Sequence, residues 1–133
     1  MAIEFVELRI NEYYGSTRKH VYYVVDNDGS TAMDGFSLLE LGMRKSVKTL
    51  ISKLATHDGK FHSKNIRHSL RGYKNLAELK IAFNRFFYFT VIDKHIIFFD
   101  FCIKKENRLS SEILASIDKK REKYEKAFRK KIF

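Results

Sequence analysis

The stretch that decides the fold runs from residue 75 to residue 89 and reads Asn75-Leu76-Ala77-Glu78-Leu79-Lys80-Ile81-Ala82-Phe83-Asn84-Arg85-Phe86-Phe87-Tyr88-Phe89. A second apolar run follows it and ends in Ile103-Lys104-Lys105. Aromatic and β-branched residues dominate both runs, and turn residues interrupt them only at Asn84 and at Asp93-Lys94. This pattern predicts an antiparallel meander with strands over 76–83, 85–92 and 95–104. The last two strands are apolar on both faces, so we expect both faces to be covered.

The segments before this meander predict two further strands and two helices. Partial alternation over 3–10 and 20–26 indicates an opening hairpin, and Asp26-Asn27-Asp28-Gly29 is a strong turn. Thr31 and Asp34 resemble a capping box at the start of a helix. Apolar residues then recur at the 3.6-residue period from Met43 to Ala55, which predicts a main amphipathic helix ending near Gly59.

The remaining segments predict a loop and a final helix. Residues 60–74 are polar, basic and weakly periodic, and we interpret them as a loop. After an N-cap at Ser110 or Ser111, a lysine-rich C-terminal helix is expected to pack one apolar stripe on the sheet. That stripe consists of Ile113, Ile117, Tyr124 and Phe128. The chain should therefore be an α+β fold, with a twisted antiparallel sheet, helices from the N-terminal half packed on it and a helix at the C-terminus.

Composition limits the class of protein. The 133 residues have no proline, six glycines and no linker-like tract, so they predict one domain over 1–133. The single cysteine, Cys102, lies within an apolar strand, which favours a reducing cytoplasm. The opening residues lack a signal-peptide pattern, and no apolar run is long enough to cross a bilayer. No spacing of cysteine, histidine or carboxylate residues resembles a metal site, and no cofactor is implied.

Positive charge is concentrated in two blocks of the chain. The formal net charge is +10, yet residues 1–43 hold only 3 lysine and arginine residues against 7 acidic ones. Residues 44–85 hold 11 against 2, and residues 104–133 hold 11 against 5. Such blocks are typical of a nucleic-acid binder or of a partner for an acidic protein. The alternative interpretation is that the basic residues form a solvated surface that binds no particular partner.

Four of these cations are expected on the sheet itself. Lys80, Arg85, Lys104 and Lys105 lie near the ends of the predicted strands. A strand holds its side chains rigidly, so such cations can be aimed at a phosphate group.

The order and spacing of several short motifs resemble one known family. These motifs are Leu70-Arg71-Gly72-Tyr73, then Leu76-Ala77-Glu78-Leu79-Lys80-Ile81, then Asn84-Arg85-Phe86-Phe87-Tyr88-Phe89, and finally Phe101-Cys102-Ile103-Lys104-Lys105. Together with the preceding strand, turn and two helices, they are similar to the phage-derived, HigB-like toxins of the RelE/ParE superfamily, over roughly residues 20–124. Residues 1–19 have no counterpart there and form an N-terminal extension, which could add a strand.

The resemblance implies a toxin of a type II toxin-antitoxin system that cleaves mRNA on the ribosome. Its partners would be mRNA, ribosomal RNA and a co-expressed helix-turn-helix antitoxin. In such cleavage the RNA 2′-hydroxyl attacks the adjacent phosphate, and cations stabilise the charge that develops there. The implied catalytic residues are Arg85 as phosphate clamp, Lys80 and Lys105 as further cations, and His68 as proton carrier. The implied RNA-binding residues are Lys104, Arg108, Arg67, Arg71 and Lys74.

Alternatives stay open for each assignment. Arg85 could instead tie a strand start to a carboxylate such as Glu78, and His68 could be an exposed loop residue without a role. Lys80, Asn84 and Asp100 depart from the family pattern. The chain could therefore be a toxin of the ParE type that binds DNA gyrase, or a module that binds nucleic acid or antitoxin without catalysis. Tyr88 could stack a base but is more typical of a core.

Overall fold

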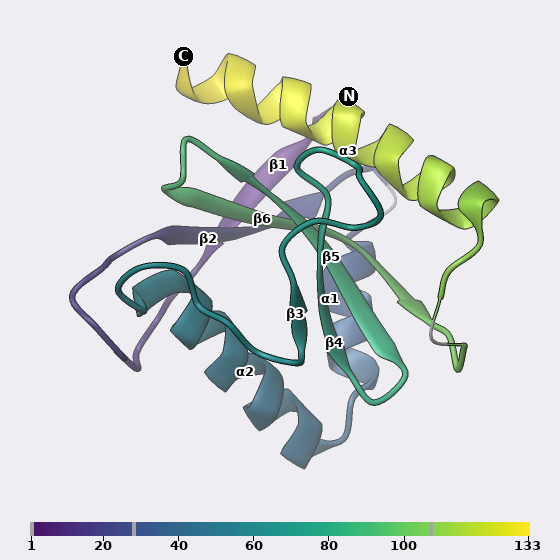
Figure 1. Ribbon diagram of the computed structural model, residues 1–133. Helices are drawn as coiled ribbons and strands as arrows, with labels where there is room; N and C mark the ends of the chain where they lie inside the picture. Colours follow the sequence, from purple (N-terminus) through teal and green to yellow (C-terminus); the bar gives the residue numbers. More distant parts are fainter. Residues whose placement is uncertain (1, 28, 107) are drawn as a thin grey trace.

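The sheet and helices of the protein are seen in a computed structural model of residues 1–133, which describes residues 2–27, 29–106 and 108–133 (Figure 1). Within these residues six strands form one sheet in the order β1-β2-β6-β5-β4-β3, and three helices accompany it. The elements are β1 (Glu4–Leu8), β2 (His20–Val25), α1 (Thr31–Leu38), α2 (Leu41–Thr56), β3 (Ile66–Arg67), β4 (Ala77–Ile81), β5 (Asn84–Val91), β6 (His95–Ile103) and α3 (Ser111–Ile132). The α+β class and the C-terminal helix predicted from the sequence are confirmed.

The predicted meander forms the middle and one side of the sheet. β4 pairs with β5 and β5 pairs with β6, both antiparallel. The β5–β6 turn places Ile92 and Asp93 at φ values of 47° and 53°. Two successive positive φ angles are typical of the tight turns that join twisted strands. The three strands therefore lie where the aromatic and β-branched runs predicted them.

The sheet is mixed, so the prediction of a purely antiparallel sheet is wrong in one place. β2 lies beside β6 and runs parallel to it, with His20 opposite His95 and Tyr23 opposite Phe98. The connection through α1 and α2 takes the chain from β2 to β3, which is the strand at the opposite edge of the sheet. Because β4 and β6 are both antiparallel to β5, β4 also runs in the direction of β2. The opening hairpin is confirmed, because β1 pairs antiparallel with β2.

Both faces of the sheet are covered, as expected for strands that are apolar on both faces (Figure 1). Phe86 and Tyr88 face α1 and α2, whereas Phe87 and Phe89 belong to the core on the α3 side. A register shift between Phe87 and Tyr88 leaves one unmatched residue, Phe99, on β6. Tyr88 is 1% exposed, and burial raises the pKa of its hydroxyl group. It is a core residue.

The helix starts follow local capping chemistry. The hydroxyl group of Ser110 accepts a hydrogen bond from the Ile113 amide, which confirms the first of the two predicted caps of α3. At α1 the cap is Ser30, whose hydroxyl group accepts from the Met33 amide at 3.2 Å. The predicted capping box at Thr31 is therefore one residue too late. The loop predicted over 60–74 contains one element, the two-residue strand β3, which pairs with β4.

The segment between β1 and β2 is joined to the end of α2 mainly through the carboxylate group of Asp58. Asp58 accepts hydrogen bonds from the amides of Ser16 and Thr17 at 2.9 Å each, and from both hydroxyl groups. These bonds favour the ionised form and lower the pKa of Asp58 from 3.8 to about 2. The segment between β1 and β2 is thereby held against the helical layer.

Asp58→Asn is expected to lower the stability of the fold at pH 7 and to have little effect at pH 2. The folded pKa of Asp58 is depressed, so its contribution is complete above pH 3.8 and is lost as the pH falls through about 2. Urea unfolding of both proteins between pH 7 and pH 2 measures this, and the two stability curves should converge in acid. A stability difference that does not change with pH would contradict the assignment.

Candidate functional site

Cations converge where β4 ends, β5 begins and β6 ends. Lys80 is the cross-strand partner of Arg85, and Arg85 is the partner of Cys102, so these three side chains form one row on one face. The amide of Lys104 donates to the carbonyl group of Phe83, which fixes the start of the following segment to the β4–β5 turn. We call this region the basic corner and define it as Arg67, Lys80, Arg85, Lys104, Lys105 and Arg108.

Arg85 lies inside the basic corner rather than on its surface. Its residue is 3% exposed, and its Nη1 donates to Oε2 of Glu78 at 3.0 Å. Glu78 is completely buried, and Nη2 of Arg85 donates to the main-chain carbonyl group of Glu106. The guanidinium group thus connects β4, β5 and the segment after β6. This geometry favours the alternative in which Arg85 ties the strand start to Glu78.

The buried ion pair is incompletely satisfied. Oε1 of Glu78 and Nε of Arg85 have no hydrogen-bond partner among the described residues. Arg67, on β3, places its Nε 4.0 Å from Oε1 of Glu78 and keeps 63% of its side chain exposed. Arg67 therefore extends the buried pair to the surface, where its remaining donors can meet an anion.

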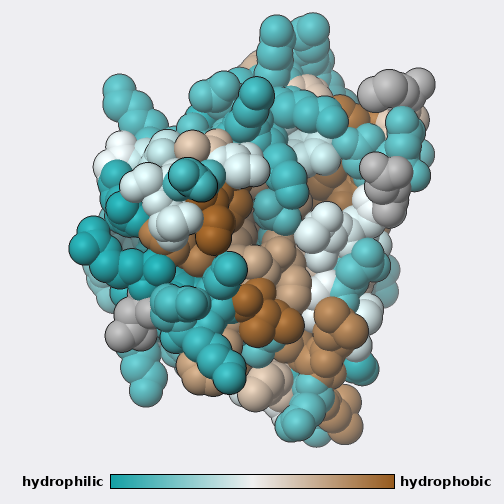
Figure 2. All heavy atoms as spheres, turned by 90° about the vertical axis from the view of Figure 1, so that its right-hand side faces the viewer, coloured by the Kyte–Doolittle hydropathy of each residue, from teal (hydrophilic) through white to brown (hydrophobic). Residues whose placement is uncertain are grey.

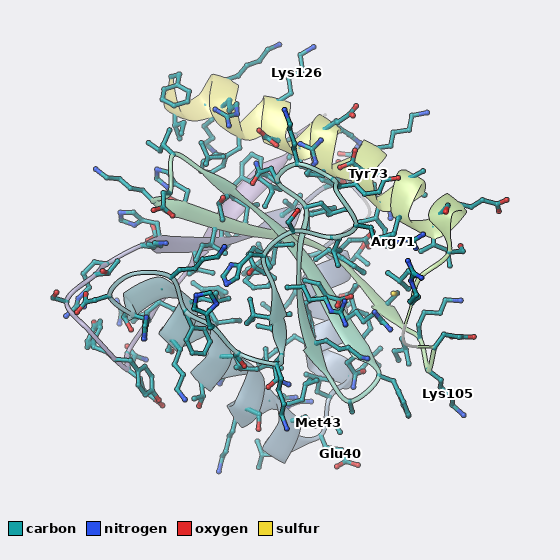
Figure 3. The ribbon with its side chains drawn as sticks, in the orientation of Figure 1. Glu40, Met43, Arg71, Tyr73, Lys105 and Lys126 are labelled. Carbon is teal, nitrogen blue, oxygen red and sulfur yellow. The ribbon has the colours of Figure 1, made fainter. Side chains whose placement is uncertain are left out.

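The other cations of the basic corner face outward. Lys80 and Lys104 are half-buried, and Lys105 and Arg108 are exposed. Within the described part of the chain, no ion pair or hydrogen bond occupies any of these four side chains. Figure 2 shows hydrophilic groups on this side of the molecule around a hydrophobic centre, and Lys105 points away from the sheet in Figure 3. These four cations are available to a polyanion.

Apolar groups accompany the cations. Phe83 is 47% exposed and Ile103 is 57% exposed. The sequence predicts Phe83 inside a strand. In the structure Phe83 lies in the turn between β4 and β5, directly after Ala82, whose φ is 52°. Cys102 packs on the core of the α3 side, and burial is the main cause that raises the pKa of its thiol. Burial thus disfavours the thiolate form of Cys102. The exposed Phe83 is a surface on which a base could stack.

Three predicted site residues, His68, Arg71 and Lys74, do not belong to the basic corner. His68 Nε2 is hydrogen-bonded to the carbonyl group of Phe61 at 2.7 Å, and the His68 ring lies 6.1 Å from that of His62. Arg71 donates to the carbonyl group of Leu109 and thereby ties its loop to the segment before α3 (Figure 3).

Lys74 is exposed and has no side-chain partner among the described residues. Strand pairing and direct contacts thus bring together Arg67, Lys80, Arg85 and Lys104, with Lys105 next in the chain. Arg108 lies in the following segment, where Arg71 contacts the neighbouring Leu109.

Asp100, a charged residue near this site, forms an ion pair that the sequence did not predict. Asp100 is 5% exposed, and its Oδ2 accepts from the ammonium group of Lys120 at 3.2 Å. The register shift in β6 turns Asp100 toward α3. A bulge leaves no signal in the alternation of a strand that is apolar on both faces, so this pairing could not be found from the sequence.

The described residues contain no group of three or more histidine, cysteine or acidic side chains placed to hold a metal ion. Nor does any helix in that part have the length and apolar character needed to cross a membrane.

Neither the protein-family models nor the curated proteins contain a match to the chain.

Proposed function

We propose that this protein is a cytoplasmic toxin of a type II toxin-antitoxin system, similar to the HigB-like members of the RelE/ParE superfamily. Its activity would be metal-independent cleavage of mRNA on the ribosome, and a helix-turn-helix antitoxin would neutralise it. The basic corner is the observation that carries this proposal. Four cations without partners among the described residues surround a buried arginine at the end of a rigid sheet.

The proposed chemistry uses these cations to hold one phosphate group and its neighbours. Lys80 and Lys104 would bind the phosphate that the RNA 2′-hydroxyl attacks, and Lys105 and Arg108 would bind flanking phosphates. Arg85 would act as a positioning residue, because its guanidinium group is already bound to Glu78 and Glu106. The proton transfers would depend on RNA positioning, since His68 has other neighbours.

The burial of Arg85 also supports a second candidate. If no guanidinium group reaches the scissile phosphate, the same surface could bind without cleaving. The protein would then act as a toxin of the ParE type on DNA gyrase, or as a module that binds nucleic acid or antitoxin only. The two candidates differ in whether mRNA is cut.

Induction of the chain alone is expected to stop growth by stopping translation. Incorporation of labelled amino acids should fall before DNA synthesis does, and co-expression of the protein encoded beside it should restore growth. Primer extension on mRNA from programmed ribosomes should show new 5′ ends. Continued translation during a halt in DNA replication would favour the gyrase candidate, and harmless induction would contradict a toxin.

Matched lysine variants connect this activity to the basic corner. Lys80→Ala/Lys104→Ala should reduce cleavage by about 100-fold or more, the effect of removing a charge-stabilising donor from the transition state. Lys94→Ala removes a lysine from the turn at the other end of β6 and should change cleavage little. Equal losses in both proteins would mean that general positive charge, not the basic corner, is responsible.

A further inference from the structure

A cavity lies on the face of the sheet that α1 and α2 cover, opposite the face that carries the row of Lys80, Arg85 and Cys102. Its volume is about 230 Å³, and residues 8–12 after β1 form one of its walls. The other walls come from both helices and from the sheet. Apolar side chains dominate them, notably Ala32, Phe36, Val47, Ile51, Phe86 and Phe98. A cavity of this kind can take an apolar group without unpairing any polar atom of the protein.

Ser52 gives the cavity wall a hydroxyl group that has no partner among the described residues. Ser52 is 7% exposed and lies on the cavity side of α2. Its main-chain carbonyl group accepts a hydrogen bond from Thr56, but its hydroxyl group has no partner among the described residues. Its oxygen is not fully enclosed, so the hydroxyl group can donate a hydrogen bond to a ligand oxygen that enters the cavity.

The mouth of the cavity carries more positive than negative charge. Lys48 lines the cavity one helical turn before Ser52, so the two side chains share one row of α2. The ammonium group of Lys48 lies 5.9 Å from the centre of the Phe36 ring, and Arg9 adds a second cation. Glu12 is also present, but the hydroxyl group of Tyr14 already donates to its carboxylate at 2.7 Å.

We propose that this cavity binds a small amphipathic acid. The carboxylate would lie between Lys48 and the Ser52 hydroxyl group, and an unbranched apolar chain would extend between Phe36 and Phe98. A cavity of about 150 Å³ admits benzene, so this one accommodates a chain of roughly six to eight carbons. A second copy of this basic chain is a poor occupant, because its net charge of +10 repels its own kind. The proposal does not depend on the toxin function.

Calorimetric titration of the full chain with octanoate tests the ligand class. Octanoate should bind at one site, and hexanoate should bind roughly 10- to 15-fold more weakly, because it buries two fewer methylene groups. Octylammonium, with the same chain and the opposite charge, should not bind. Equal affinity for the two octyl compounds would overturn the carboxylate site, and absence of octanoate binding would overturn the proposal altogether.

Two surface variants and one cavity variant locate the site. Lys48→Glu should weaken octanoate binding by at least tenfold, whereas Lys45→Glu, on the same helix but outside the cavity, should change it less than twofold. Ala32→Leu fills part of the cavity and should weaken octanoate more than hexanoate. Circular dichroism verifies that each variant is folded. If Ala32→Leu does not fold, the comparison of Lys48→Glu with Lys45→Glu still locates the site. Equal effects of the two lysine substitutions would show that binding is merely electrostatic and would overturn the site.

Discussion

Glu78→Ala is expected to destabilise the fold by about 3–5 kcal/mol, because it leaves the buried Arg85 guanidinium group without its carboxylate. Both residues are almost fully buried, so water cannot replace the lost partner. Arg85→Ala should cost a similar amount, since it leaves the Glu78 carboxylate buried and unpaired. Urea unfolding monitored by circular dichroism measures both changes.

The double replacement Glu78→Leu/Arg85→Met is the control for this pair. It removes both charges together and fills the space, so it should recover most of the stability that either alanine variant loses. If the chain cleaves mRNA as proposed, single-turnover cleavage by the folded fraction of Arg85→Ala separates a structural from a catalytic role of Arg85. A stable Arg85→Ala protein that binds ribosomes normally but no longer cleaves mRNA would show that Arg85 clamps the phosphate after all.

Gly35→Ala should also destabilise the protein, although alanine is the better helix former. A Cβ atom at Gly35 would lie 2.2 Å from Cγ of Phe101 and 2.4 Å from Cδ2 of the same ring. The whole base of the ring would have to move, and overpacking of this kind costs about 1–3 kcal/mol. Thermal unfolding should therefore show a melting temperature below that of the wild type.

Gly42→Ala is the matched control on the next helix. No atom lies within 4 Å of a Cβ at Gly42, so the substitution should stabilise the protein by up to about 1 kcal/mol through helix propensity. Phe101→Ala should remove most of the penalty of Gly35→Ala when the two are combined. Stabilisation by Gly35→Ala would contradict the close approach of α1 to β6.

The fold elements were predictable where the pattern is local. Runs such as residues 84–91 combine β-branched and aromatic residues with clear turn signals, and α2 shows a helical period. The parallel pairing of β2 with β6 was not predictable, because it depends on which way the chain returns after α1 and α2. Neither was the contact of Gly35 with Phe101, which joins residues distant in sequence.

The candidate site was predictable as a set of cations but not as a geometry. Strand register brings Lys80 beside Arg85, and a near-correct prediction of β4 and β5 already implies that pair. Burial depends instead on the segment after β6, whose carbonyl group at Glu106 closes over Arg85. Nothing in the sequence of that segment indicates where it crosses the sheet. His68 failed to join the cations because its loop folds back on Phe61.

The pairing of β2 with β6 also determines how late in folding the sheet can be completed. Residues 20–23 must wait for residues 95–98 before the centre of the sheet can close, and such non-local closure is slow. Until then α1 and α2 have no complete surface to cover, and the row through Lys80, Arg85 and Cys102 lacks its third strand. A chain that has not yet paired β6 with β5 therefore lacks a complete basic corner, whatever local structure its earlier segments have formed.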